Sequence, residues 1–375
     1  MGESRPRILS DGEKLDWLRL IRSQAVGPIT FHRLLERFGP AAAALDALPG
    51  LARRGGRRDL KVCSRDAAER EMEQVSRAGA RLVALGEPDY PPLLALIEDA
   101  PPLISVLGHA GLLRKRAVAV VGARNASLNG LTIARRIAGE LGGSGLMVVS
   151  GMARGIDAAA HQGALDTGTV AVLGGGVDVP YPRENAALYD DLKARGTLVS
   201  EVAPGVQPQA RHFPRRNRII AGMGRGVLVV EASPRSGSLI TARLALEQGR
   251  EVFAVPGSPL DPRARGANDL LRQGATLAET GEDIVRALRD MAPKPLEEPE
   301  PVDFAGGTPA SPDQDAVDAA RGRVTELLGP SPVTVDEVLR NCQFSLAVVT
   351  LVLLEMELAG RLQRHPGNRV SLVPD

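Results

Sequence analysis

The sequence predicts an α/β protein whose central domain is a doubly wound, mostly parallel sheet, with a smaller helical module before it and another after it. Between about residues 110 and 290, short apolar and β-branched runs alternate with helical patterns. Most of these runs are apolar throughout, which is typical of parallel strands covered on both faces. Glycine- and serine-rich turns follow the runs, at the positions where such sheets bind their ligands.

The central domain is assigned to residues 86–290, and we expect six strands and six helices in it. The strands are expected at 117–121, 146–149, 169–173, 197–202, 227–231 and 251–255. The helices are expected near 129–142, 155–167, 184–195, 217–224, 238–248 and 282–291.

Residues 1–85 predict a small helical domain, because apolar residues recur at helical spacing around 15–21 and 34–38. The turn between them, Val26-Gly27-Pro28-Ile29-Thr30, resembles the hairpin of helix–hairpin–helix (SAM-like) modules, which point backbone amides at DNA phosphates. An ordinary helical bundle is the alternative interpretation. A basic loop follows, which we interpret as solvated; it contains Arg53, Arg54, Arg57 and Arg58.

Residues 291–316 predict a linker, since six prolines and six acidic residues fall between 293 and 315. Residues 317–375 predict three helices, ending near 328, 342 and 360, and then a hairpin, which is the order of a winged helix. The third helix contains no Lys or Arg and two Glu. Because phosphate neutralisation supplies most affinity for duplex DNA, we expect this module to contact a partner rather than a major groove.

Composition limits the kind of site the chain can carry. Its 375 residues have a net charge of +1, so a nucleic-acid site has to be a local patch. Cys63 and Cys342 fit no metal or redox spacing, and we expect neither a metal nor a cofactor. No apolar run is long enough for a signal peptide or a membrane span, so we expect a cytoplasmic protein.

The strongest signal for a binding site is the stretch 211–218. It holds four arginines, and no Asp or Glu lies between Glu201 and Glu231 to neutralise them. Guanidinium forks match phosphate geometry, and an aromatic ring offers a face on which a base can stack. We expect Pro214 to interrupt the helix here and Asn217 to cap the next one. The predicted contacts are Arg211, Phe213, Arg215, Arg216, Asn217 and Arg218.

Each of these contacts has a structural alternative. The arginines at 216 and 218 would instead tie the loop to strand carbonyls, Arg218 more readily because it enters a helix. The ring of Phe213 would instead plug the core. Tyr181 is a second candidate for stacking.

Three turns are expected at the same end of the sheet, because each follows a predicted strand. A second acid-free stretch, 100–139, contributes Arg124, whose alternative is an ion pair with Glu231 or Asp157. We expect Glu231 to orient an arginine. Asp157 and His161 are one helical turn apart, but without a third ligand we expect surface pairing or a buried hydrogen bond. The predicted site residues of the turns are Gly122, Arg124, Ser127, Ser150, Gly151, Arg154, Ser236, Gly237 and Ser238.

Long ordered motifs in residues 110–280 resemble the DNA-processing protein A family (DprA, also called Smf). They include Ser150-Gly151-Met152-Ala153-Arg154-Gly155, Phe213-Pro214 followed by Arg216-Asn217-Arg218, and Ser236-Gly237-Ser238. The family's first turn usually reads Gly-Ser-Arg, and Ala123 removes its hydroxyl here. The resemblance implies a Rossmann-like domain that binds single-stranded DNA without catalysis. It also implies protection of incoming DNA in natural transformation, dimers formed through this domain, and loading of RecA recombinase.

Two rival functions remain open at this point. Related Rossmann-like nucleotide phosphoribohydrolases use a Pro-Gly-Gly-x-Gly-Thr loop and a following Glu, whereas this chain has Ser236-Gly237-Ser238-Leu239. A sensor of mononucleotides is the third interpretation. Tight binding of AMP or release of a base would favour one of these rivals.

Overall fold

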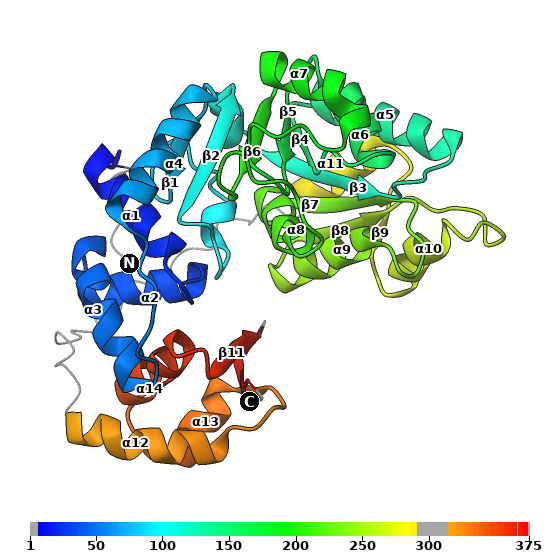
Figure 1. The fold of residues 1–375 in the computed structure, drawn as a ribbon. Helices are drawn as coiled ribbons and strands as arrows, with labels where there is room; N and C mark the ends of the chain where they lie inside the picture. Colours follow the sequence, from blue (N-terminus) through cyan, green and yellow to red (C-terminus); the bar gives the residue numbers. More distant parts are fainter. Residues whose placement is uncertain (1–6, 291–313, 366, 374–375) are drawn as a thin grey trace, which may run out of the picture. The chain divides into compact units, whose positions relative to one another are not determined.

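The computed structural model describes residues 7–290, 314–365 and 367–373 (Figure 1). They form two compact units, one of residues 7–15 and 66–290 and the other of residues 16–65 and 314–373. Most of the expected linker, 291–316, lies outside the described residues. Within the described ranges, no helix has the length and apolar character needed to cross a membrane.

The first unit is built on a nine-stranded sheet with the order β1-β2-β6-β5-β4-β3-β7-β8-β9. All pairs from β6 to β9 are parallel, whereas β1 pairs with β2, and β2 with β6, in the antiparallel sense. The strands are β1 (Arg81–Ala84), β2 (Leu103–Gly108), β3 (Ala117–Gly122), β4 (Met147–Ser150), β5 (Thr169–Val172), β6 (Thr197–Ser200), β7 (Gly226–Val230), β8 (Glu251–Ala254) and β9 (Thr276–Leu277). The predicted doubly wound, mostly parallel sheet is confirmed, and the sequence analysis missed β1, β2 and β9.

Helices cover both faces of this sheet (Figure 1). On one face lie α5 (Leu128–Gly143), α6 (Ile156–Ala164), α7 (Ala186–Arg195) and α11 (Gly281–Asp290), and on the other α8 (His212–Met223) and α9 (Gly237–Glu247). Strand β3 shows why its sequence is apolar throughout: Ala117, Ala119 and Val121 face one core, and Val118 and Val120 face the other. The unit also contains α4 (Arg65–Arg77), α10 (Arg265–Arg272) and the short 3-10 helices η1 (Leu94–Leu96), η2 (Ala110–Arg114) and η3 (Arg183–Asn185).

Helix α8 begins five residues earlier than expected. Pro214 lies in its first turn, where a missing N–H leaves no helical hydrogen bond unmade, so the proline does not interrupt the helix. Asn217 lies inside α8 and does not cap it. Both expectations were wrong. The consequence is that Arg216, Asn217 and Arg218 have directions fixed by a helix, and all three are buried.

The second unit combines the two ends of the chain. Its elements are α1 (Asp11–Arg22, from Asp16 on), α2 (Pro28–Phe38), α3 (Ala41–Arg54), α12 (Gln314–Leu327), α13 (Val335–Cys342) and α14 (Leu346–Leu358), with a sheet of β10 (Val333–Thr334), β11 (Leu362–His365) and β12 (Arg369–Leu372). The predicted winged helix is confirmed. The sequence analysis placed 1–85 and 317–375 in separate domains, but residues 16–65 and 314–373 share one hydrophobic core.

The two halves of this unit meet where α3 ends against α14. A Cβ placed on Gly55 would lie 2.0 Å from the carbonyl oxygen of Glu355, so the two backbones are in direct contact. The Glu355 side chain is fully buried and accepts hydrogen bonds from Arg54 and Arg321, each at 2.7 Å. Removing either guanidinium would leave a buried carboxylate short of a partner, which is costly. Helix α14 therefore packs on the N-terminal helices of its own chain.

We predict that Gly55→Ala lowers the free energy of unfolding of the second unit by about 1–3 kcal/mol, because the new methyl group overlaps the Glu355 carbonyl. Gly55 has a φ of −72°, which alanine adopts freely, so the overlap alone is tested. Denaturation can be followed by the fluorescence of Trp17, the single tryptophan, which packs on Phe31 in this unit.

Gly50→Ala is the matched control for this variant. Gly50 lies in the same helix, its Cβ would meet only the Arg54 guanidinium at 3.8 Å, and alanine favours helix. If the two variants unfold with equal stability, the contact between α3 and α14 does not have the importance assigned to it.

Candidate nucleic-acid interface

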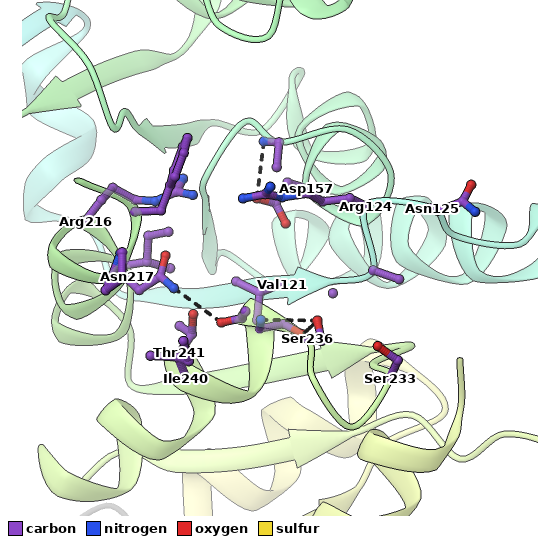
Figure 2. Close-up of a pocket in the computed structure, with 18 of the residues that line it drawn as sticks. Val121, Arg124, Asn125, Asp157, Arg216, Asn217, Ser233, Ser236, Ile240 and Thr241 are labelled. Atoms are coloured by element: carbon purple, nitrogen blue, oxygen red, sulfur yellow. Dashed lines mark hydrogen bonds between the residues drawn. The ribbon is translucent and has the colours of Figure 1, made fainter. Parts of the chain in front are cut away.

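A cleft of about 770 Å³ opens at the carboxyl ends of the parallel strands. Its walls come from the turns after β3 and β7, from the first turns of α8 and α9, and from α6 (Figure 2). A smaller cavity of about 60 Å³ shares part of the same wall, including Arg124, Tyr181 and Phe213. The cleft lies where the loops of a parallel sheet bind ligands.

The structure brings most of the predicted site residues to this cleft. The main cleft is lined by Gly122, Arg124, Phe213, Arg216, Asn217, Ser236, Gly237 and Ser238. Gly151 and Arg154 line the smaller cavity. Five predicted residues line neither space: Ser127, Ser150, Arg211, Arg215 and Arg218.

Phe213 is at the centre of the cationic part of the wall. Its ring lies 5.2 Å from the guanidinium carbon of Arg124 and 5.8 Å from that of Arg216, measured to the ring centroid. The ring of Tyr181, which is 46% exposed, lies 6.0 Å away at an angle of 36°. Phe213 is half-buried and belongs to none of the hydrophobic cores, so it is a wall of the cleft and not a plug.

Arg124 is exposed, and no carboxylate within the described ranges forms an ion pair with it. Of the two expected competitors, Glu231 instead accepts hydrogen bonds from the backbone N–H of Ser127, at 2.9 Å, and from its hydroxyl. Burial raises the pKa of the other, Asp157, and the charge of Arg124 is among those that oppose this shift, so Asp157 lies within electrostatic range of Arg124 without forming an ion pair. Glu231 therefore does not hold Arg124, although its negative charge acts on another arginine of the cleft, Arg263. Ser127 also caps α5 by accepting from the Gly130 N–H at 2.9 Å, which explains why it does not line the cleft.

Arg216 combines the two roles that the sequence left open. Its Nη1 donates to the carbonyl oxygens of Gly151, at 2.5 Å, and Val172, at 3.0 Å, so it ties α8 to the carboxyl ends of β4 and β5. Its Nε is buried without a hydrogen-bond partner. Burial lowers the pKa of Arg216 to about 10, although Asp157 opposes that shift, so the group stays cationic at neutral pH. Figure 2 shows Arg216 reaching the cleft from α8 while Arg124 reaches it from the turn after β3.

The other buried polar residues of α8 have structural partners. Asn217 donates through Nδ2 to the Gly237 carbonyl at 3.3 Å, which ties α8 to the start of α9. Arg218 donates from Nη2 to both carboxylate oxygens of Glu201, each at 2.6 Å, and from Nη1 to the Asp99 carbonyl at 2.7 Å. The premise that nothing neutralises these arginines was therefore wrong for Arg218.

Three further predicted residues lie outside the main cleft for local reasons. Ser150 is fully buried, and its hydroxyl donates to the Val120 carbonyl at 2.6 Å. Arg211 and Arg215 are exposed beside the start of α8.

One carboxylate does line the cleft. Asp157 is 6% exposed and accepts from the Ala153 N–H at 3.3 Å (Figure 2). Burial raises the pKa of Asp157, although Arg216 opposes the shift. Asp157 and His161 do not pair, because the His161 Nδ1 bonds to Thr169 Oγ1 at 2.8 Å. Burial and the charge of Arg216 lower the pKa of His161 to about 3. The expected buried hydrogen bond is confirmed for His161, and the described residues hold no cluster fit to bind a metal ion.

Several residues that line the cleft were not predicted from the sequence, among them Asn125, Ser233, Thr241 and Arg263. Asn125 and Ser233 lie in turns that were predicted to contribute to the site. Their position next to predicted contacts could have identified them as lining residues. Arg263 gave no signal, because its approach to the cleft depends on the long loop after β8. The Arg263 guanidinium donates hydrogen bonds to the Asp261 carboxylate at 2.9–3.2 Å.

Comparison with known proteins gives three family matches. The family described as DNA recombination-mediator protein A matches residues 81–289. A DprA-like N-terminal HHH domain matches residues 11–73, and a DprA winged helix domain matches residues 308–368. Protein Smf of Escherichia coli is 38% identical over 326 residues, which are 86% of this chain and 85% of that protein.

Two solved structures are similar to this chain. That of DNA processing protein A from Streptococcus pneumoniae has a TM-score of 0.61 and 36% identity, covering 75% of this chain and 98% of that one. That of DNA processing protein A from Helicobacter pylori, described with a single-stranded DNA binding mode, has a TM-score of 0.52 and 25% identity, covering 56% and 96%. The sheet, the cleft at its carboxyl edge and these matches agree: the chain belongs to the DNA recombination-mediator protein A family.

Proposed function

We propose that this protein binds single-stranded DNA in the cleft at the carboxyl edge of its sheet. The observation that carries the proposal is the exposed guanidinium of Arg124, which lies over the Phe213 ring and has no ion pair in the described part of the chain. A free guanidinium binds phosphate, and the ring beside it offers a stacking surface for a base. Stacking of this kind needs a base that is not already paired in a duplex, which favours single strands.

The similarity to the Helicobacter pylori protein supports the same ligand. We further propose, from the family resemblance, that the strand is incoming DNA in natural transformation and that the protein protects it in the cytoplasm. Loading of RecA recombinase and a homodimer formed through the Rossmann-like domain belong to this proposal.

A nucleotide hydrolase or a nucleotide sensor is the second candidate, and Asp157 is the observation in its favour. A carboxyl group with a raised pKa beside two arginines resembles an acid–base residue in a phosphate site. We propose binding without catalysis, because His161 bonds to Thr169 and Asp157 accepts from the Ala153 N–H, so the two are not paired for proton transfer.

Arg124→Ala is predicted to weaken binding of a short oligothymidylate by roughly 10- to 100-fold, the worth of a charge-assisted hydrogen bond. The slope of log affinity against log salt should also become shallower by about 0.7, since one phosphate contact is lost. Fluorescence anisotropy at several salt concentrations measures both quantities. Arg243→Ala is the matched control, because Arg243 is an exposed arginine of the same unit that pairs only with Glu247.

Arg218→Ala is expected to lower stability rather than to act on DNA binding directly, which distinguishes a structural arginine from a DNA-binding one. It removes the buried guanidinium that pairs with Glu201 and Asp99, so the free energy of unfolding of the first unit should fall by about 1–3 kcal/mol. An Arg124 variant that unfolds as readily as this one, or that keeps its affinity, would contradict the proposed site.

Phe213→Leu is predicted to cost about 1–3 kcal/mol of single-strand affinity, because it removes the stacking face while it keeps an apolar side chain. Phe213→Tyr retains the ring and should bind within a few-fold of the natural protein. Titration calorimetry measures both variants. Equal affinity of the Leu and Tyr variants would show that no base stacks on this ring.

Asp157→Asn tests the pH dependence of binding. The raised pKa of Asp157 means that lowering the pH protonates it before an exposed aspartate, which removes a negative charge beside Arg216. Affinity should therefore rise as the pH falls through the Asp157 pKa, while His161 stays neutral above its pKa of about 3. The Asn variant should lack this pH step and bind at least as tightly at pH 7.

Protonation of Asp157 should favour the folded state as well as DNA binding. A folded-state pKa above the unfolded value means that the natural protein loses stability as the pH rises through it, a loss absent from the Asn variant. The enzyme candidate predicts something different: release of base from a nucleoside monophosphate by the natural protein, abolished by Asp157→Asn. Detection of such release would replace the binding proposal.

A further inference from the structure

The two helices that meet in the second unit end in the same way. In α3, the N–H groups of Gly56 and Arg57 return to carbonyls of the last turn at 3.0 and 2.8 Å. In α14, the N–H groups of Gly360 and Arg361 do the same at 2.9 Å each. Both glycines have positive φ, +102° and +75°, as this type of helix end requires. Each helix therefore places an arginine directly after its terminal glycine.

These two arginines lie across the junction of the helices. The Arg361 Nη1 is 4.0 Å from a Cβ built on Gly56, and the Arg57 Nη1 is 3.9 Å from one built on Gly360. Residues distant in sequence thus make one local surface. Its arginines, which we call the junction arginines, are Arg53, Arg54, Arg57, Arg58 and Arg361.

The positive charge of this surface exceeds its local neutralisation. Counting Arg321 with the five junction arginines gives six cations against three partner carboxylates, Asp59, Asp318 and Glu355, an excess of three. The ends of α3 and α14 together offset about one further charge through their dipoles. Nearby, Arg364 and Glu357 pair with each other at 2.9 Å and cancel.

Two of the junction arginines form no ion pair in the described part of the chain that would account for their presence. Arg58 and Arg361 are exposed, and neither has an ion pair within the described ranges. Compensation of the helix dipoles accounts for Arg57, which also pairs with Asp59 at 3.3 Å, but it does not require Arg58. The Arg54–Glu355–Arg321 contact fixes the two halves of the unit to each other, so this surface exists only when both halves are docked.

We propose that the junction arginines form a second DNA-contacting surface, which binds the phosphodiester backbone of a strand longer than the cleft holds. The proposal rests on the proposed function of the cleft. Guanidinium forks suit phosphate, and a surface without an aromatic residue should bind independently of sequence. An anionic membrane is disfavoured, because none of the exposed large apolar residues of the described chain lies in 50–60 or 355–365, so nothing there would insert into a bilayer.

The test compares two oligothymidylates on the full-length protein, one of about 6 nucleotides, the scale of a single binding site, and one of about 40. Arg58→Ala with Arg361→Ala should weaken binding of the long strand about tenfold and make its salt slope shallower by about 1.4, while the short strand binds as before. Arg58→Lys with Arg361→Lys should retain most of the long-strand affinity. Arg70→Ala with Arg77→Ala, two exposed arginines of α4 in the other unit, is the charge-matched control.

Each other outcome has a distinct meaning. Unchanged affinity for both strands overturns the proposal, and so does equal weakening of both, which would mean action through the cleft. Loss of binding to phosphatidylserine vesicles with unchanged long-strand affinity would assign the surface to a membrane. A shifted Trp17 unfolding curve for the Ala pair but not for the Lys pair would mean a structural role. The proposal that the cleft binds DNA is tested separately, by the affinity of Arg124→Ala for the short strand.

Discussion

The buried guanidinium of Arg216 is the constraint on which the binding edge depends. By donating to the carbonyls that end β4 and β5, it fixes the first turn of α8 against the sheet. That turn carries Phe213, whose ring then faces Arg124 from the other side of the cleft. A single charged group thus orders the wall and adds to its positive potential. The two polar residues that follow it in α8 are also buried, each with its own partners: Asn217 with the Gly237 carbonyl, and Arg218 with Glu201 and Asp99.

The cleft shows what a sequence pattern can and cannot reveal about arginines. The mostly parallel sheet, its six central strands and the collection of turns at one edge followed from the apolar runs and from the geometry of parallel sheets, whereas the strand order and the start of α8 did not. The absence of Asp and Glu between residues 201 and 231 suggested unpaired cations. The fold nevertheless brings carboxylates to Arg218: Glu201, at the edge of that interval, and Asp99, which is distant in sequence. Asp157 likewise comes from another element, the first turn of α6, to act on Arg216. Such partners depend on tertiary contacts that no local pattern encodes.

The second unit shows a similar limit at the level of domains. The helical pattern and the terminal hairpin predicted a winged helix correctly, and the lack of Lys and Arg in the third helix predicted contact with a partner, which stays a prediction. The structure shows that this helix packs on the N-terminal helices of its own chain. The identity of that contact was out of reach, because it joins Gly55 to Glu355 across most of the chain. Its consequence is that the helix which reads DNA in other winged helices is here committed to the fold, while the ends of α3 and α14 bring arginines together.

The central claim is that a bare strand lies in the cleft with a base against Phe213. Photo-crosslinking of the natural protein to a single strand containing 5-iodouracil, followed by mass spectrometry of the peptides, tests it most directly. The account predicts that the main crosslinked peptide contains Phe213, with Tyr181 as the next site. Crosslinks confined to residues outside the cleft, with none at Phe213 or Tyr181, would contradict it.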